Sequence, residues 1–249
     1  MLDQTNAHLV NQIAHDSSVV LDQGVAETYL RYARMIADRG YVSAATGNMV
    51  MRQSHPRYPD GICYVKCQGV SLEEMTVKDI IITDVPHGLI LYGDRGTTVG
   101  HQMNREILRL RPDVQAVIHL HHDETIAFFA AGFEELKITG LTFPYLMQSL
   151  PHYLPAHINV EDDVAPIKTF IADVNCFIMK RHGFTVLGRN VSECYHRVNV
   201  LTSEVKRNII AEQLAAARGA KPAYLTLDEM KHMFQHGDAV MYPAVTRNH

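Results

Sequence analysis

The stretch AVIHLHHDET, residues 116–125, places the strongest constraint on this chain, because it ends an apolar run with three histidines within four positions. From Val114 to Leu120 every even position is apolar, which is the pattern of a β-strand over residues 113–121. Successive side chains of a strand point to opposite faces, so His119 and His121 share one face. Such a pair can offer two imidazole nitrogens to one metal ion, although polar residues at the end of a strand would give the same pattern.

Length and composition set the class of protein. The 249 residues are 47% apolar and 20% charged, which suits one α/β domain over residues 1–249. Because 23 Lys and Arg face 27 Asp and Glu, with no basic block, we expect no nucleic-acid partner. No apolar run approaches the roughly 20 residues of a membrane helix, and residues 1–10 lack the order of a signal peptide. We therefore expect no membrane association and a cytoplasmic location.

Cysteine and histidine counts carry little information by themselves. The four cysteines form no CxxC pair, and in a reducing compartment we expect buried thiols. With 15 histidines in the chain, a single one says little, so only their arrangement counts as evidence.

Periodicity predicts the elements of the fold. Helical spacing is found in residues 25–36, 101–110, 123–131, 191–218 and 225–234. Strands are predicted after a turn within residues 43–52, at 62–69, 80–84, 88–94 and 113–121, and twice within 175–188. Residues 55–61 are predicted as a loop, and the proline-rich residues 140–160 as irregular.

The boundaries and order of these elements indicate a fold class. Gly40 and Gly219 lie where the first and the longest helix should end, and Ser192 is a candidate N-cap of the longest helix. The strands meet mostly through short turns, with helices at both ends and few βαβ alternations. This order favours an α/β fold, a single α/β/α layered domain around a largely antiparallel central sheet.

A third candidate ligand occurs in MKRHGFTVLG, residues 179–188. His182 stands at a break between two predicted strands, and Gly183 follows it where the backbone must pass close to something. A histidine at such a break can project from the edge of a sheet.

Together, HLH followed by RHG resembles the class II aldolase and adducin superfamily. TGNMVMR and QGVSLEEMTVKDI are similar to the two phosphate-loop segments of that family, and RPDVQAVIHLH and MKRHGFTVLG to its metal strands. The resemblance implies that His119, His121 and His182 are ligands of a divalent cation. Zinc is favoured for such a set, while manganese, iron or cobalt would suit expanded coordination. The resemblance also implies a homotetramer.

The sequence departs from the family at the acid–base residue. The position of the family's acidic residue falls on Gly100, and no carboxylate occurs between Asp94 and Glu106. His101 stands beside the gap and is our candidate for catalytic proton transfer, because its ordinary pKa near 6.5 suits that work. The alternative is a solvent-facing histidine at the start of a helix.

The predicted substrate-binding loops are also incomplete. Thr46, Gly47 and Asn48 match the first loop, but Gln68, followed by Gly69, stands where the family usually has a hydroxyl residue. Backbone N–H groups and Asn48 could still hold an anion, most economically a carboxylate. We therefore expect a small-molecule carboxylate as the substrate.

The missing acidic residue and the incomplete binding loops favour decarboxylation. Retro-aldol cleavage needs a base for a hydroxyl proton and a metal that stabilises the remaining enediolate. Loss of CO2 needs the same electron sink, but only a proton donor afterwards. We expect a metal-dependent lyase, most simply a decarboxylase that acts through a metal-stabilised enolate on a hydroxy-aromatic or pyridine carboxylate or a keto acid. The resemblance is closer to the decarboxylase-type branch.

Other functions stay open from the sequence. They are a sugar-phosphate aldolase or epimerase with a substitute base, an iron-dependent oxygenase acting on a keto acid, and a non-catalytic, metal-binding oligomer. Two histidines and two tyrosines of the proline-rich segment are candidate proton donors or neighbours of the ligands: His152, His157, Tyr145 and Tyr153.

Overall fold

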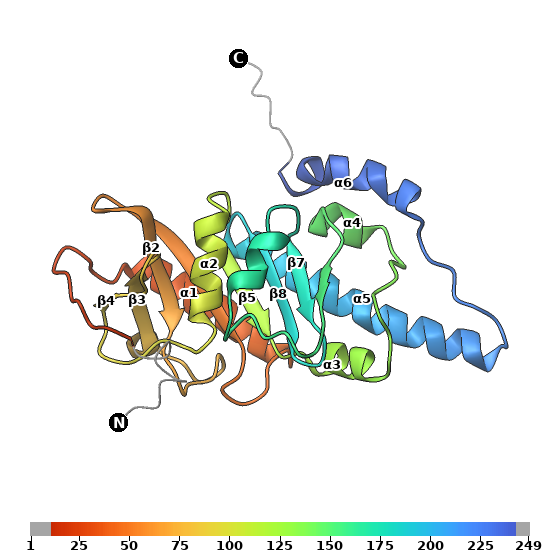
Figure 1. Cartoon of the computed structure of the whole chain (residues 1–249), viewed down its shortest axis with the longest axis horizontal. Helices are drawn as coiled ribbons and strands as arrows, with labels where there is room; N and C mark the ends of the chain where they lie inside the picture. The colour runs from red at the N-terminus through yellow and green to blue at the C-terminus, as the bar shows by residue number, and fades with distance from the viewer. Residues whose placement is uncertain (1–10, 243–249) are drawn as a thin grey trace, which may run out of the picture.

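The computed structural model describes residues 11–242, so the first ten and last seven residues of the expected domain lie outside the described part. Its strands form one sheet in the order β4-β3-β2-β1-β5-β8-β7-β6 (Figure 1). The strands are β1 (Asn48–His55), β2 (Tyr58–Lys66), β3 (Ile80–Asp84), β4 (Ile90–Tyr92), β5 (Ala116–Leu120), β6 (His152–Leu154), β7 (Cys176–Met179) and β8 (Gly183–Gly188). The helices are α1 (Gln23–Asp38), α2 (His101–Leu110), α3 (Asp123–Ala130), α4 (Thr142–Met147), α5 (Val191–Ala217) and α6 (Leu227–Met241), with 3₁₀ turns η2 (Val77–Asp79) and η3 (Ala165–Thr169).

The expected largely antiparallel sheet is confirmed, and β6 with β7 is the parallel pair within residues 11–242. Two local predictions were wrong. Residues 55–61 are not all loop, because β1 runs to His55 and β2 begins at Tyr58 across a tight turn. Residues 140–160 are not all irregular either, since they contain α4 and β6.

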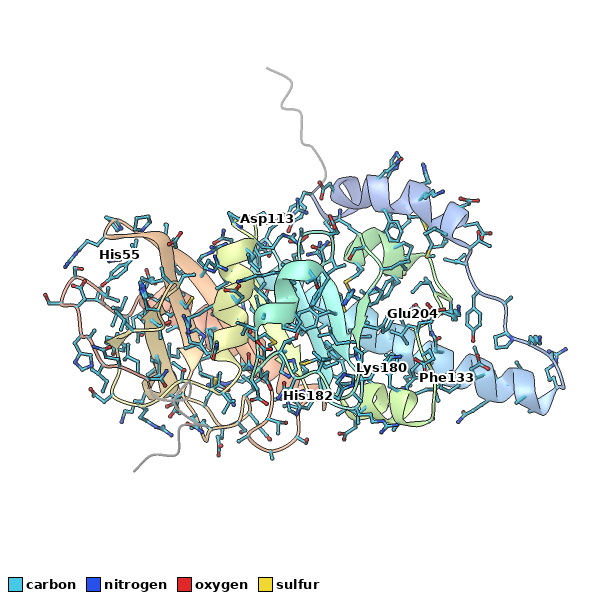
Figure 2. All side chains as sticks on the ribbon, viewed as in Figure 1. His55, Asp113, Phe133, Lys180, His182 and Glu204 are labelled. Carbon is cyan, nitrogen blue, oxygen red and sulfur yellow. The ribbon has the colours of Figure 1, made fainter. Side chains whose placement is uncertain are left out.

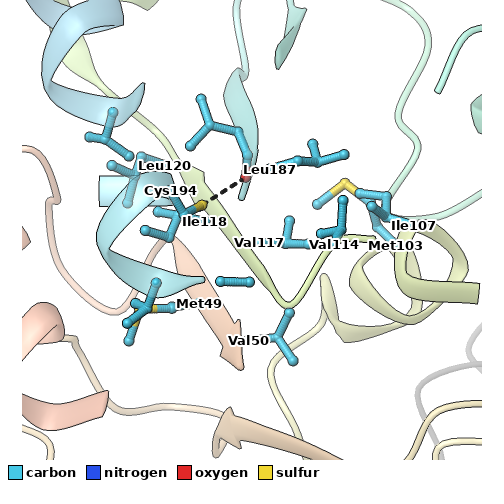
Figure 3. Close-up of a cluster of buried hydrophobic side chains, with 14 of the residues drawn as sticks. Met49, Val50, Met103, Ile107, Val114, Val117, Ile118, Leu120, Leu187 and Cys194 are labelled. Carbon is cyan, nitrogen blue, oxygen red and sulfur yellow. Dashed lines mark hydrogen bonds between the residues drawn. The ribbon is translucent and has the colours of Figure 1, made fainter. Parts of the chain in front are cut away.

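Helices cover both faces of the sheet, as the layered fold requires. The even positions of β5, Ile118 and Leu120, pack toward α5, and Val117 packs with Val50 on the side of α2 (Figure 3). Figure 1 shows α2 in front of the sheet and α1 with α5 behind it. The odd positions of β5 therefore face α2, and His119 is one of them.

Helix ends agree with the sequence except at one cap. Gly40 and Gly219 follow α1 and α5 with positive φ values of 71° and 60°, a conformation that favours glycine. The N-cap of α5 is Asn190, whose side chain accepts a hydrogen bond from the Glu193 N–H. Ser192 was the wrong prediction, because it lies inside the first turn of the helix and Asn is an equally good cap.

The helix α2 is held at both ends by strand β1. At its C-terminus the Arg52 guanidinium donates to the carbonyls of Leu108 and Arg111, at 3.0 Å and 2.9 Å. Toward its N-terminus the Asn104 amide donates to Asn48 Oδ1 at 2.7 Å. These contacts fix the start of α2 over the start of β1, at Asn48.

The expected thiol state is confirmed, and no membrane-spanning helix is found. All four cysteines are free and buried. None of the helices in residues 11–242 combines the length and the apolar character needed to cross a bilayer.

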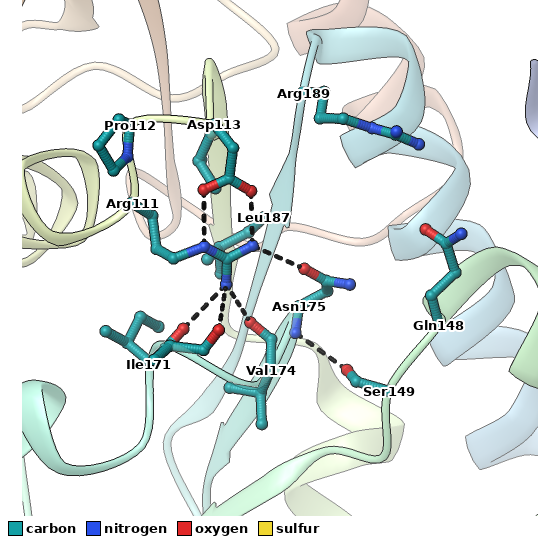
Figure 4. Close-up of polar contacts among 12 residues, drawn as sticks. Arg111, Pro112, Asp113, Gln148, Ser149, Ile171, Val174, Asn175, Leu187 and Arg189 are labelled. Carbon is teal, nitrogen blue, oxygen red and sulfur yellow. Dashed lines mark hydrogen bonds and ion pairs between the residues drawn. The ribbon is translucent and has the colours of Figure 1, made fainter. Parts of the chain in front are cut away.

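The RPD sequence before β5 has a structural role. Arg111 forms two parallel hydrogen bonds with the Asp113 carboxylate, at 2.8 Å and 2.7 Å (Figure 4). The same guanidinium donates to the carbonyls of Ile171 and Val174, at 2.9 Å and 3.0 Å, and to Asn175 Oδ1 at 3.3 Å. Arg111 thus ties the start of β5 to the segment that enters β7.

We expect Arg111→Ala to lower the free energy of unfolding by about 2 kcal/mol, because it leaves part-buried carbonyls without donors. Asp113→Ala should cost less than about 1 kcal/mol, since its half-exposed carboxylate forms a surface ion pair. Urea unfolding of both variants measures the difference. Equal losses would show that the ion pair, and not the carbonyl contacts, stabilises this junction.

Candidate metal centre

The row of residues across β1, β5 and β8 positions the first imidazole. Asn48 pairs with His119, and His119 with Thr185. His119 is fully buried, and its Nδ1 lies 3.0 Å from the Thr185 hydroxyl. That contact leaves Nε2 as the atom that faces the site. Among the described residues this buried Nε2 has no hydrogen-bond partner.

His121 and His182 complete a group of three imidazoles. His121 directly follows β5, and His182 lies in the turn between β7 and β8, where its N–H donates to the Met179 carbonyl at 3.0 Å. Their Nε2 atoms are 3.2 Å apart, and the three ring centroids lie 4.5 to 5.3 Å from one another. Figure 2 shows His182 at the lower end of the sheet.

Gly183 allows the turn to approach β5. A Cβ at this position would overlap the carbonyl oxygen of Leu120 and lie 3.0 Å from its carbonyl carbon. The predicted close passage of the backbone after His182 is therefore confirmed, and it places His182 beside His121.

Glu161 is a fourth member of the site that sequence reasoning missed. Its Oε2 lies 3.2 Å from His182 Nε2, and its Oε1 lies 3.9 Å from His119 Nε2. The four candidate ligand atoms of His119, His121, Glu161 and His182 all lie within 4.8 Å of one another. Glu161 belongs to the loop between β6 and η3, where no local pattern marks a ligand. The acid expected at residue 100 is absent, as the sequence shows, but Glu161 places a carboxylate at this site from another segment.

The electrostatics keep these groups in the forms that bind a cation. Burial lowers the pKa of His119 to about 3, and burial followed by the neighbouring His182 lowers the pKa of His121. For Glu161, burial acts to raise the pKa, but the three imidazoles outweigh it and lower the pKa to about 2. At neutral pH the site therefore offers neutral His119 and His121 and an ionised carboxylate.

These residues fit a divalent cation. A buried imidazole nitrogen without a partner is costly, and here it faces two further imidazoles and a carboxylate. Three nitrogen donors and one oxygen donor form the kind of set that holds zinc and related metals. His121 and His182 are only partly buried, so the site has an open side.

The structure places His101 elsewhere. Its imidazole is buried, with Nε2 2.8 Å from the Thr83 hydroxyl, and burial, followed by the charge of Arg105, lowers its pKa well below the ordinary value. The alternative of a solvent-facing histidine is therefore wrong. His101 is not part of the group around Glu161, and its role in proton transfer stays a prediction.

The predicted anion loops lie on two sides of a lysine that sequence reasoning missed. The buried Lys66 ammonium donates to the carbonyls of Ala45 and Val70, at 2.8 Å and 2.5 Å. It thereby joins the segment containing Thr46 and Gly47 to the segment containing Gln68 and Gly69. A buried lysine at the end of a strand could have been noted from VKCQG, because lysine is seldom found fully buried without a role.

The residues of the two predicted binding loops differ in their contacts and exposure. A Cβ on Gly47, where φ is 73°, would come 3.1 Å from the His119 carbonyl oxygen, so this glycine lets the loop pass close to β5. Asn48 Nδ2 lies 3.5 Å from Glu161 Oε1. The Thr46 hydroxyl donates to the Ser43 carbonyl at 2.5 Å, and Gln68 and Gly69 are exposed. Of the five predicted loop residues, Asn48 is thus the one whose side chain contacts the candidate metal site, through Glu161.

The proline-rich candidates have structural contacts. His152 stacks on Phe170 with ring centroids 4.1 Å apart, and the Tyr153 hydroxyl accepts a hydrogen bond from the Leu136 N–H. His157 is exposed and Tyr145 half-buried. Their suggested roles near the ligands stay predictions.

The model of the class II aldolase and adducin N-terminal domain family matches residues 27–207. The chain belongs to this family. Its four-member site is built on the strands and turns within that match. The resemblance inferred from HLH and RHG is confirmed.

Several relatives carry names of activities. An L-fuculose phosphate aldolase of Methanococcus maripaludis is 26% identical over 189 residues, which are 75% of this chain and 97% of that protein. A 3-oxo-tetronate 4-phosphate decarboxylase of Escherichia coli K12 is 24% identical over 229 residues, which are 86% of this chain and 96% of that protein. These names denote lyases, in agreement with the expected metal-dependent lyase.

Solved structures show the same fold. The crystal structure of YgbL from Escherichia coli, described as an aldolase, epimerase or decarboxylase, matches with a TM-score of 0.71 and 22% identity. It covers 85% of this chain and 98% of the YgbL chain. The α/β fold with a mostly antiparallel sheet is therefore that of class II aldolases.

We expect His119→Ala, His121→Ala and His182→Ala each to abolish metal binding while the chain stays folded, because the sheet is held by apolar packing. Thr185→Val should weaken the affinity about 10- to 100-fold, since it removes the hydroxyl that orients His119. Metal content after dialysis, together with circular dichroism, measures both effects. If one of these histidine variants keeps full metal occupancy, the histidine replaced in it is not a metal ligand.

Proposed function

We propose that this protein is a metal-dependent carbon–carbon lyase, and that its reaction is the decarboxylation of a small keto acid. The observation that carries the proposal is the convergence of His119, His121, His182 and Glu161 on one point with an open side. Hydroxy-aromatic and pyridine carboxylates are the other substrate class that fits the same chemistry. Zinc is the favoured metal, with manganese, iron and cobalt as alternatives.

The chemistry of the site suits this reaction. When bound, a divalent cation would polarise the oxo oxygen of the substrate and so stabilise the electron pair left behind by CO2. The partly exposed His121 and His182 mark the side from which a substrate oxygen can approach. Burial of His119 and Glu161 keeps bulk water from the opposite side.

The binding loops supply a place for the anionic end of a substrate. Asn48 contacts the ligand group, and the Lys66 ammonium brings a buried positive charge to the ends of both loops. Burial and then His182 lower the pKa of His121, Glu161 acts to raise it, and the charge of Lys66 has a smaller lowering effect. A carboxylate or phosphate is the ligand that such a loop pair attracts.

The similarity extends over almost the whole of both kinds of relative, 96% of the 3-oxo-tetronate 4-phosphate decarboxylase and 97% of the L-fuculose phosphate aldolase, so the choice between them is made from the residues. The departure of Gln68 from a hydroxyl residue points away from the sugar-phosphate aldolases. A 3-oxo acid also fits the required chemistry, because its oxo group is the electron sink for loss of the neighbouring CO2.

A second candidate is a sugar-phosphate aldolase. Glu161 favours it, because a carboxylate at the metal site can act as the base that retro-aldol cleavage requires. The L-fuculose phosphate aldolases of Methanococcus maripaludis and Methanococcus vannielii among the relatives favour it as well. Decarboxylase and aldolase share the metal site and differ in which bond next to the oxo group is broken.

We expect the metal-loaded protein to release CO2 from 3-oxo-tetronate 4-phosphate or another small keto acid, and His121→Ala to lower the rate at least about 10²-fold. Coupled CO2 detection gives the rate, with L-fuculose 1-phosphate and an oxygen electrode run alongside. Aldehyde formation without CO2 would establish the aldolase, and oxygen uptake would establish an oxygenase. Metal binding without any turnover would point to a non-catalytic, metal-binding oligomer.

We also propose that the chain forms a homotetramer. The part of α5 that extends beyond the sheet exposes Ile210 and Leu214 (Figure 1). The C-terminal α6 packs on its own chain, where the Gln148 amide donates to Asp238 at 3.0 Å, and Ile210 and Leu214 remain 43% and 61% exposed. An apolar helix surface of this kind suits contact with another copy.

Sedimentation equilibrium should give a mass four times the 28.0 kDa of the chain. Leu214→Glu should shift the mass toward smaller species, because it places a charge on the apolar part of α5. A wild-type monomer would contradict the proposal directly.

A further inference from the structure

We propose that Gly100 and Glu161 form a matched pair, in which the loop after β6 supplies the carboxylate ligand of the metal and the glycine leaves the space for it. This inference rests on the metal site of the proposed function. It assigns to Glu161 the place at which a side chain of residue 100 would otherwise stand.

The space above Gly100 is filled by Glu161. A Cβ built on Gly100 would overlap Glu161 Oε1, and it would lie 3.0 Å from Glu161 Cδ and 2.7 Å from Asn48 Nδ2. Residue 100 is the N-cap of α2, and its φ of −69° is open to every amino acid. The glycine therefore leaves the room that the Glu161 carboxylate occupies, and no unusual backbone conformation calls for it.

The loop delivers the carboxylate from a fixed point. Val160 is completely buried, and the Glu161 N–H donates to Asn159 Oδ1 at 3.1 Å. The N–H groups of Asp162 and Asp163 both donate to the Asn159 carbonyl, at 3.2 Å and 3.1 Å. This turn directs Glu161 inward, while the next two carboxylates remain exposed.

The surroundings of Glu161 also identify its role. A carboxylate that is 8% exposed needs a cationic or hydrogen-bonding partner. Its polar contacts are the imidazoles of His119 and His182 and the Asn48 amide, and both imidazoles belong to the metal site. Glu161 thus completes the donor set from the side of α2.

Metal affinity is the direct test, measured by competition of Zn²⁺ with a chelator. Glu161→Gln should lower the affinity at least as much as loss of a residue that only orients a ligand, about 10- to 100-fold. Asp163→Asn is the matched control, because it removes the charge of a neighbouring exposed carboxylate whose side chain accepts from the Ala165 N–H and does not contact Asn159, and it should leave the affinity unchanged. Equal affinities of Glu161→Gln and wild type would overturn the inference.

The pairing itself is tested by a double-mutant cycle. Gly100→Ala should lower the affinity about as much as Glu161→Ala, because the added methyl group displaces the carboxylate. The double variant should lose no more than Glu161→Ala alone, which is the sign of coupled residues. Gly96→Ala, in the same loop, is the control and should bind Zn²⁺ as wild type. Additive losses, or no loss in Gly100→Ala, would overturn the pairing.

A transposition variant completes the test. Gly100→Glu combined with Glu161→Ala should regain much of the lost affinity, because the carboxylate returns to the same space from α2. The absorption spectrum of the Co²⁺-loaded protein reports the ligand set without any substrate. These readouts separate the two proposals: if Zn²⁺ binding depends on Glu161 but no substrate is turned over, the pairing stands and the proposed function fails.

Discussion

The register of β5 between β1 and β8 is the constraint on which the site depends. Ile118 and Leu120 bury against α5, and this fixes His119 on the opposite face. A slip of one residue would turn His119 into the apolar layer beside α5 and move Ile118 and Leu120 out of their packing there, where burial of each side chain is worth about 1.5 to 3 kcal/mol. Core packing therefore sets the direction of the imidazole, and the row of Asn48, His119 and Thr185 follows from the same register.

Because the register holds the imidazoles in place, the buried Glu161 carboxylate has partners for its charge. Glu161 places a carboxylate beside three imidazoles in a place that water hardly reaches. The pKa values of His119 and Glu161, at about 3 and about 2, mean that a cation does not have to displace protons from these two groups at neutral pH. The fold thus prepares a site with one negative charge, which a divalent ion can neutralise.

The sequence pattern predicted those features that depend only on residues close together in the chain. The alternation of apolar residues predicted the strand that carries His119, and the break before Gly183 identified His182 as a candidate ligand. The strand β6 escaped prediction because it is three residues long, lies between prolines and pairs with β7 through a distant contact. Glu161 escaped for a related reason, since nothing in NVEDDVAP distinguishes the inward carboxylate from the two exposed ones. The turn around Asn159 and the burial of Val160 make that distinction, and both depend on the folded chain.

Counting along a family motif compares positions in sequence, whereas chemistry depends on positions in space. At residue 100 the motif has a gap, yet the space beside that residue contains a carboxylate. An acid supplied from a loop faces the same imidazoles as an acid supplied from the start of α2, because both approach the end of β5. The gap is therefore no argument that the site has lost its acid. We infer that the choice between decarboxylation and aldol cleavage depends instead on which substrate the two predicted binding loops admit, where the Lys66 ammonium joins the loops and Gln68 stands in place of a hydroxyl residue.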